Sequence, residues 1–385
     1  MSITAAKGFV AGGLACGIKE SGAPDLALIA TDDHRAVPAA AVFTSNLAQA
    51  APVQISRAHL LDGRAAAVVL SSGNANAATG EAGRRDARRM CELAGTGLDA
   101  ATADVLVCST GLIGIPMPMP ALESGIPKLC GVLAATGGGD AAQAILTTDT
   151  VRKEAIASVG QGVVGGIAKG AAMLSPAMAT MLAVLTTDVI AVSPVLQEAL
   201  ARAVSETFDC LSVDGCRSTN DTVIVLSSGR APAVDNVELI DAFTEVCGSL
   251  AEQMAKDAEG ATKLVRVQVV GARTQGEARV AARAVANSQL VQCSLNGGDA
   301  YWGRVLSELG ASGAFIDPEA VDIAYSGVVV CRDGIACAHD ATMLAERMAR
   351  REIAVQCDLH LAHGEATVLT TDLSHAYIDE NRRTS

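Results

Sequence analysis

Short apolar runs alternate with amphipathic polar stretches along the chain, and their lengths predict ordinary strands and helices in mixed order. Helices are predicted at residues 84–93, 140–146, 193–208, 237–258, 276–287, 302–309 and 339–351. Strands are predicted at residues 26–32, 38–44, 64–70, 104–108, 221–226, 263–270, 289–294 and 320–330, with hairpins over 154–168 and over 353–361 with 364–371. Because the two kinds of element are mixed, without a regular βαβ repeat, the pattern favours α+β layers over a doubly wound sheet.

The apolar run from Thr180 to Val192 predicts a buried strand that begins with a hydroxyl residue. The small residue Ala179 precedes it, and this arrangement is typical of proteins that cleave themselves. If the Ala179–Thr180 bond breaks, Thr180 holds both a hydroxyl nucleophile and a free α-amine. That amine has a pKa of about 7.7–8.0, so it can act as a base without a histidine. The same residues also fit a plain threonine at the start of a core strand.

A second hydroxyl group follows the predicted strand 104–108, in the turn formed by Ser109, Thr110 and Gly111. A strand that ends in Thr-Gly points a hydroxyl and a backbone N–H the same way. Such a pair can stabilise a developing oxyanion. The same triplet also fits an ordinary turn.

Other motifs are weaker. Residues 160–165 match the dinucleotide pattern Gly-x-Gly-x-x-Gly but continue as strand, without the helix that would bind phosphate. His360 and His363 fall near the tip of a predicted hairpin, which favours a surface role. The spacing of Cys331, Cys337 and His339 fits no zinc pattern. We therefore expect no metal and no bound cofactor.

The bulk properties narrow the class of protein. A length of 385 residues exceeds the size at which one core usually stops growing, so two lobes are expected, with a boundary in the turn near residues 229–236. The net charge of −13 argues against a nucleic-acid partner. The eleven scattered cysteines indicate reduced thiols and a cytoplasmic protein. The glycine-broken apolar stretch 8–16 is rejected as a targeting segment, and no run reaches the roughly 20 residues of a membrane span.

Several short stretches of the sequence are informative together, because of the order and spacing in which they occur. They are residues 7–9, 41–46, 72–76, 109–114, 147–150, 168–170, 173–188, 212–215, 218–222, 259–263 and 302–304. Together they resemble the ornithine acetyltransferases, the bifunctional glutamate N-acetyltransferases and amino-acid acetyltransferases of arginine biosynthesis, over essentially the whole chain.

The resemblance implies a layered α/β/β/α sandwich of the self-cleaving N-terminal-threonine type, with a smaller C-terminal α/β lobe. It implies cleavage between Ala179 and Thr180 into an α chain, 1–179, and a β chain, 180–385, that stay together. Two such αβ pairs would form a heterotetramer. The substrates would be amino acids, with acetyl-CoA as a second acetyl donor in some members.

The resemblance also implies a ping-pong reaction. Thr180 Oγ attacks the acetyl carbonyl of N-acetylornithine, its own α-amine takes the proton, and the Thr110 hydroxyl with the Gly111 N–H holds the oxyanion. Glutamate then attacks the acetyl-threonine, so the acyl bond energy is conserved without ATP. The substrate contacts that it implies are Thr147, Lys169, Thr180, Glu259, Asn381 and a terminal hydroxyl residue, Ser385 or Thr384.

Some positions depart from the family pattern. They are Ala177, Cys216-Arg217, the segment 299–304, and a tail one residue shorter than usual. They leave room for a different amino-acid acceptor, as in a natural-product pathway. Two other functions stay open: an N-terminal-nucleophile amidase or aminopeptidase, in which water takes the acyl group, and a non-catalytic relative that keeps the fold as a scaffold.

Overall fold

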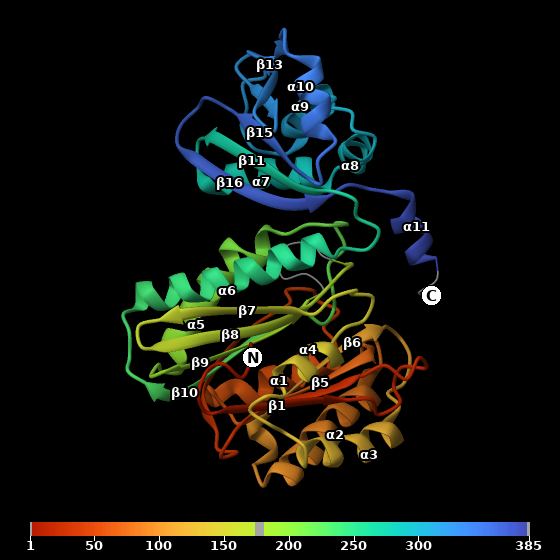
Figure 1. Cartoon of the computed structure of the whole chain (residues 1–385), viewed down its shortest axis with the longest axis vertical. Helices are drawn as coiled ribbons and strands as arrows, with labels where there is room; N and C mark the ends of the chain where they lie inside the picture. The colour runs from red at the N-terminus through yellow and green to blue at the C-terminus, as the bar shows by residue number, and fades with distance from the viewer. Residues whose placement is uncertain (1, 174–180, 383–385) are drawn as a thin grey trace. The chain divides into compact units, whose positions relative to one another are not determined.

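The computed structural model of the chain describes residues 2–173 and 181–382 (Figure 1). The chain divides into two compact units: unit 1 comprises residues 1–209 and 216–254, and unit 2 comprises residues 210–215 and 255–385. The turn at residues 229–236, where the sequence predicts a lobe boundary, therefore lies inside unit 1. The physical reason is that the helix after this turn packs on a sheet of unit 1.

The described part of unit 1 contains two β-sheets. The four-stranded sheet has the order β1 (Phe9–Leu14), β2 (Leu26–Thr31), β5 (Ala67–Asn74), β6 (Val105–Leu112). The six-stranded sheet has the order β4 (Arg64–Ala65), β3 (Val37–Phe43), β10 (Thr222–Ala231), β9 (Leu182–Val189), β8 (Gly162–Lys169), β7 (Lys153–Val159). The pairs β5–β6 and β9–β10 are parallel, and the other neighbours are antiparallel.

The two sheets pack face to face, because alternate residues of their strands form one buried cluster. Ile29 and Leu106 of the first sheet share this cluster with Val184 and Ile224 of the second. The other face of β2, β5 and β6 packs on helices α1 (Ala51–His59), α2 (Gly80–Leu98) and α3 (Met119–Cys130). The helix α4 (Gly138–Ala144) packs beside β1 and β2, and the 3-10 turns are η1 (Leu60–Asp62), η2 (Thr102–Asp104) and η3 (Phe208–Cys210).

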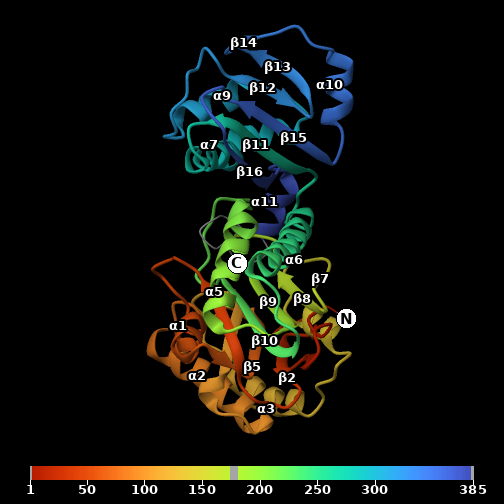
Figure 2. The same cartoon turned by 90° about the vertical axis from the view of Figure 1, so that its left-hand side faces the viewer.

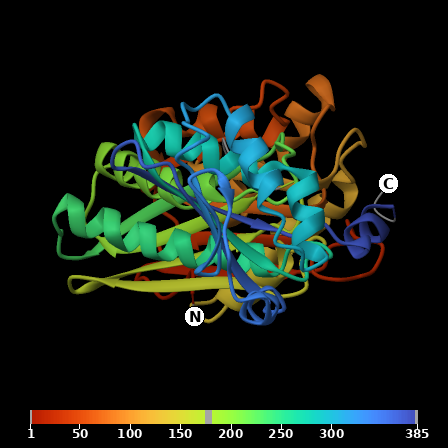
Figure 3. The same cartoon turned by 90° about the horizontal axis from the view of Figure 1, so that it is seen from above.

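Helices α5 (Ser193–Glu206) and α6 (Asn236–Lys256) cover the outer face of the six-stranded sheet (Figures 1 and 2). Helix α6 runs along β7 and β8 (Figure 3), and a Cβ on Gly166 of β8 would lie 2.8 Å from Val246 of this helix. The order of layers in unit 1 is therefore helix, sheet, sheet, helix. The α/β/β/α sandwich expected from the sequence is confirmed.

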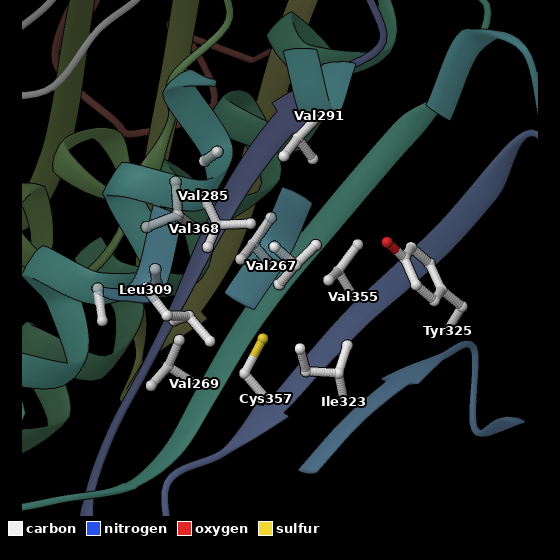
Figure 4. Packing of buried hydrophobic residues seen from close by; sticks show 14 of the residues in the cluster. Val267, Val269, Val285, Val291, Leu309, Ile323, Tyr325, Val355, Cys357 and Val368 are labelled. Carbon is white, nitrogen blue, oxygen red and sulfur yellow. The ribbon is translucent and has the colours of Figure 1, made fainter. Parts of the chain in front are cut away.

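Unit 2 is built on one sheet with the order β14 (Ile335–Ala336), β13 (Val328–Arg332), β12 (Asp322–Tyr325), β15 (Glu352–Asp358), β11 (Leu264–Ala272), β16 (Gly364–Thr371). Val267 and Val355 of the sheet meet Val285 and Leu309 in the core beneath its helices (Figure 4). The helices of this unit are α7 (Gln275–Asn287), α8 (Gln289–Asn296), α9 (Trp302–Ala311), α10 (Ala341–Met348) and α11 (His375–Asn381). Unit 2 is thus the smaller α/β lobe that was expected.

Three local predictions were wrong. Residues 289–294 form helix α8 instead of a strand, because Ser288 caps its N-terminus and Val291 and Leu295 reach the core at helical spacing. The strands at 352–358 and 364–371 are not a hairpin, because β11 lies between them and pairs with both. The predicted strand 320–330 is divided at Ser326-Gly327 into β12 and β13.

The sequence also understated the four-stranded sheet. The glycine-broken stretch 8–16 contains β1, which pairs with β2 along its full length. The predicted turn at Thr110-Gly111 is instead the end of β6, and β5 continues beside it to Asn74. In the described part of the chain, we find no helix both long enough and apolar enough to cross a membrane.

Candidate active site

The Thr110-Gly111 pair lies near the end of β6, where the backbone of Gly111 lies close to that of Gly73 and Asn74 on β5. Gly111 has a φ of +131°, and a Cβ at this position would lie 2.3 Å from the carbonyl carbon of Gly73 and 2.5 Å from the nitrogen of Asn74. Only glycine fits such a backbone contact. Thr110 is 3% exposed, so its hydroxyl lies in a mainly protein environment where a hydrogen bond is strong.

Lys169, the last residue of β8, reaches this pair from the facing sheet. Its Nζ donates a hydrogen bond to Thr110 Oγ1 over 3.1 Å, and both side chains are buried. An ammonium can only donate, so the hydroxyl oxygen accepts this bond and its own hydrogen points elsewhere. The lysine therefore leaves Thr110 as a hydrogen-bond donor, as an oxyanion site requires.

Asp149 connects Thr147 with the lysine end of β8. One carboxylate oxygen accepts hydrogen bonds from the Thr147 N–H at 3.0 Å, and the other accepts from the Gly170 N–H at 2.7 Å. Asp149 also forms a fully buried ion pair with Lys153 at 2.5 Å. Burial acts to raise the pKa of Asp149, but Lys169, Lys153 and the hydrogen bonds outweigh it and lower the pKa to about 2.

A second lysine, Lys19, lies beside the same loop. Its Nζ donates to the carbonyls of Pro24 and Leu146, both at 2.7 Å, and Leu146 directly precedes Thr147. Burial lowers the pKa of Lys19, and the positive charge of Lys169 lowers it further. Asp25 fixes the turn that carries Lys19 by accepting backbone N–H bonds at residues 16, 18 and 19. Sequence reasoning missed Asp149, Lys19 and Asp25, because their hydrogen bonds and ion pairs form only in the folded chain.

The proposed cleavage bond itself, Ala179–Thr180, lies outside the described residues, as do Ala177, Thr384 and Ser385. The strand after it is placed by two ladders. Leu182 pairs with Lys169 of β8 on one side and with Thr222 of β10 on the other. The beginning of β9 therefore lies beside the end of β8 that carries Lys169.

Residues just before β10 connect the start of β9 with the Thr110-Gly111 pair. Asp221 Oδ1 accepts the Met181 N–H at 2.9 Å. The Asn220 side-chain amide donates to the carbonyl of Ser109 at 2.8 Å and to that of Ala75 at 2.6 Å. Since Ser109 adjoins Thr110, residues 220 and 221 connect the start of β9 with the end of β6. Both residues belong to the stretch 218–222 that contributes to the family resemblance, but no role was predicted for either from the sequence.

In unit 2, the structure brings together two of the predicted substrate contacts. Asn381 Nδ2 donates to Glu259 Oε2 at 2.8 Å, and the Glu259 side chain is mostly buried. The next residue, Gly260, has a φ of +63°, and a Cβ there would lie 2.2 Å from the backbone nitrogen of Tyr377. The Glu259 turn and helix α11 are therefore packed backbone to backbone, which holds the carboxylate and the amide as one pair.

The remaining candidates lie elsewhere. His360 is exposed and lies 3.3 Å from Asp322 and 3.5 Å from Asp358. Across residues 2–173 and 181–382 we find no cluster of side chains suited to hold a metal ion. All eleven cysteines belong to this described part, and none of them forms a disulfide bond there.

The layered fold and this site define the class. A buried hydroxyl next to a glycine, with a lysine bound to the hydroxyl, can stabilise an oxyanion, and the threonine before β9 can act as a nucleophile. Acyl-transfer enzymes use this combination of groups. The model of the ArgJ family matches residues 10–384, and the chain therefore belongs to that family. The expected family and the expected enzyme class, an acetyltransferase of arginine biosynthesis, are thereby confirmed.

Two relatives compared by sequence, from Streptomyces coelicolor and Mycobacterium leprae, agree with this assignment. The arginine biosynthesis bifunctional protein ArgJ of Streptomyces coelicolor is 45% identical over 385 residues, covering 99% of each chain. The ArgJ of Mycobacterium leprae is 44% identical, covering 98% of this chain and 94% of the relative. The solved ArgJ of Bacillus halodurans is 32% identical with a TM-score of 0.49, covering 51% of this chain and 96% of that one. A solved ornithine acetyltransferase of Mycobacterium tuberculosis, complexed with ornithine, is 40% identical with a TM-score of 0.42. The match covers 46% of this chain and 94% of that one.

Proposed function

We propose that the protein transfers an acetyl group from N2-acetylornithine to L-glutamate through an acetyl-Thr180 intermediate. Family membership supports the reaction class. The observation that carries the proposal is the buried hydrogen bond from Lys169 to Thr110 beside Gly111, because it leaves the Thr110 hydroxyl as a donor at this strand end.

The reaction begins after cleavage of the Ala179–Thr180 bond. Thr180 Oγ attacks the acetyl carbonyl while the α-amine of Thr180 takes the hydroxyl proton. The oxyanion is held by the Thr110 hydroxyl and the Gly111 N–H. The C–N bond then breaks, the α-amine returns the proton to ornithine, and acetyl-threonine remains. Glutamate reverses these steps with its own amine as the attacking group, so neither ATP nor another energy source is used.

Charge complementarity supports the substrate roles. Lys169 has three N–H donors, of which Thr110 takes one, and its charge suits an α-carboxylate. Thr147, held by Asp149, offers a hydroxyl beside it. Glu259, oriented by Asn381, suits the ammonium group of ornithine. The terminal hydroxyl contact is assigned to Ser385, with Thr384 as its alternative.

The proposal extends to assembly. The α chain 1–179 and the β chain 180–385 stay together because β9 of the second lies between β8 of the first and β10. Two αβ pairs form a heterotetramer, and the protein works in the cytoplasm on small amino acids without a bound cofactor. Acetyl-CoA is a candidate second donor, to be included in any donor panel.

The test is a denaturing gel combined with an acetyl-transfer assay. Cleavage of the 385-residue chain after Ala179 yields fragments of 179 and 206 residues. We expect Thr180→Ala to remain uncleaved and inactive, and Thr180→Ser, which keeps a hydroxyl, to be cleaved. Mass spectrometry after mixing with acetylornithine should locate an acetyl group on Thr180. An uncleaved Thr180→Ala protein with full activity would contradict the proposal, and acetate release in excess glutamate would favour a hydrolase.

A further inference from the structure

Asp221 is a buried carboxyl group that the transfer reaction above does not use. It directly precedes β10 and has no solvent exposure. Its Oδ1 accepts the Met181 N–H at 2.9 Å, whereas its Oδ2 has no hydrogen-bond partner among the described residues. A buried carboxyl oxygen without a partner is costly and therefore calls for an explanation.

The position of this carboxyl relative to the cleavage bond follows from covalent structure. The Met181 nitrogen, which Asp221 holds, is bonded to the carbonyl carbon of Thr180. Asp221 is therefore bound to the backbone amide that directly follows Thr180 in the chain. The adjacent Asn220 binds the carbonyl of Ser109, so the same turn is also fixed to the oxyanion strand.

The surroundings favour the protonated form of this carboxyl. Burial raises the pKa of Asp221 well above its usual value, and the negative charge of Asp209 raises it further. The hydrogen bond from Met181, the Ser218 side chain and the positive charge of Lys169 on β8 act in the opposite direction, but burial outweighs them. The group therefore keeps its proton to a higher pH than an exposed carboxylic acid does.

Self-cleavage needs such a group. Before cleavage, the nitrogen of Thr180 is part of an amide and has no lone pair that can serve as a base. The Thr180 hydroxyl must nevertheless lose a proton, and the amide nitrogen must gain one before it can leave. The base of the mature enzyme is thus absent from the precursor, and another group has to move this proton.

We propose that Asp221 carries the proton from the Thr180 hydroxyl to the leaving amide nitrogen when the chain cleaves itself. This inference rests on the proposed function. Thr180 Oγ forms a bond to the Ala179 carbonyl carbon and gives its proton to one carboxyl oxygen, while the other oxygen gives a proton to the Thr180 nitrogen. The C–N bond breaks and leaves an ester, and Asp221 ends as it began. Water then hydrolyses the ester to the Ala179 carboxylate and the free Thr180 hydroxyl.

The experiment follows cleavage of the full chain made by cell-free translation. A labelled pulse is chased in buffers on both sides of neutrality, and the precursor and its fragments are separated on a denaturing gel. Asp221→Asn keeps the shape and removes the acidic carboxyl proton. Asp188→Asn is the matched control, because Asp188 is also buried and accepts the Val163 N–H at 2.8 Å, but at the other end of β9.

We expect Asp221→Asn to slow cleavage by at least about 100-fold, the usual minimum for a lost proton carrier, and Asp188→Asn to cleave at nearly the wild-type rate. Wild-type cleavage should slow as the pH rises through the raised pKa of Asp221. Circular dichroism checks that each variant folds. If Asp221→Asn does not fold, this wild-type pH profile decides the matter.

Two results overturn the inference. One is a folded Asp221→Asn chain that cleaves within threefold of wild type, and the other is a wild-type rate that stays constant or rises with pH. Either leaves the proposed function intact, because the wild-type chain still cleaves. A wild-type chain that never cleaves refutes the proposed function itself, which keeps the two failures distinguishable.

Discussion

Replacing Thr110 by valine removes the proposed oxyanion donor and keeps the shape of the side chain. Valine is β-branched like threonine, so β6 should retain its backbone and its pairing with β5. The change deletes one hydroxyl that accepts from Lys169 and that, by our proposal, donates to the oxyanion. Thr110→Ser deletes a methyl group instead and keeps the hydroxyl.

The expected magnitude has two parts. Loss of one oxyanion donor costs about 2.7–4 kcal/mol of transition-state stabilisation, which corresponds to a fall in kcat of about 10²–10³. Separately, the buried Lys169 ammonium loses the acceptor that lies 3.1 Å away, which lowers the free energy of unfolding by about 1–3 kcal/mol. The KM for acetylornithine should change little, because the oxyanion exists only in the transition state and intermediate.

The assay is acetyl transfer from acetylornithine to glutamate under saturating conditions, alongside denaturant unfolding of the same preparations. Cleavage is scored first on a gel, because the same donors would also stabilise the oxyanion of self-cleavage. Thr186→Val is a matched control: Thr186 is a buried residue of β9 whose hydroxyl donates to the carbonyl of Ile3 at 2.6 Å. It should lose stability and keep its kcat. A cleaved, folded Thr110→Val enzyme with kcat within threefold of wild type would refute the assignment of Thr110.

Three further predictions follow from single contacts. Gly111→Ala places a Cβ 2.3 Å from the Gly73 carbonyl carbon at a φ of +131°, so urea unfolding should show a loss of at least about 1–3 kcal/mol. The pKa of Asp149 is lowered from 3.8 to about 2, so its contribution to the free energy of unfolding is present above pH 4 and is lost as the pH falls toward 2. Asp149→Asn should flatten this part of the plot of unfolding free energy against pH. Asn381→Ala removes the 2.8 Å bond that orients Glu259, and we expect about a tenfold rise in the KM for acetylornithine with kcat nearly unchanged.

Elements with a strong local pattern could be predicted from the sequence. The hairpin of β7 and β8 and the long helix α6 were placed within a few residues, because their periodicity lies within one segment. Strand neighbours are a different matter. The sequence suggested that β15 and β16 pair because they are consecutive, but β11, nearly a hundred residues earlier, lies between them. Nothing in either strand encodes that insertion.

In the candidate site, too, some residues could be predicted from the sequence and others could not. Thr110-Gly111 could be recognised as a hydroxyl followed by glycine after a strand, although the reason for the glycine, the close approach of Gly73, was not visible. Lys169 and Glu259 came only from resemblance to a family. Asp149 remained hidden because its value depends on ion pairing and hydrogen bonds that only the folded chain creates.

The β-ladders hold the start of β9 beside the end of β8 and the start of β10, where we propose that both cleavage and transfer take place. Leu182 is fixed on both sides, by Lys169 and by Thr222, so the start of β9 is held in register with β8 and β10. A slip of β9 by one residue would turn its side chains to the opposite faces of a strand that is buried throughout, which the packing forbids. Substitutions that disturb the start of β9 should therefore impair cleavage and acetyl transfer together. Substitutions at Glu259 or Asn381, which belong to unit 2, should affect substrate binding while the chain still cleaves.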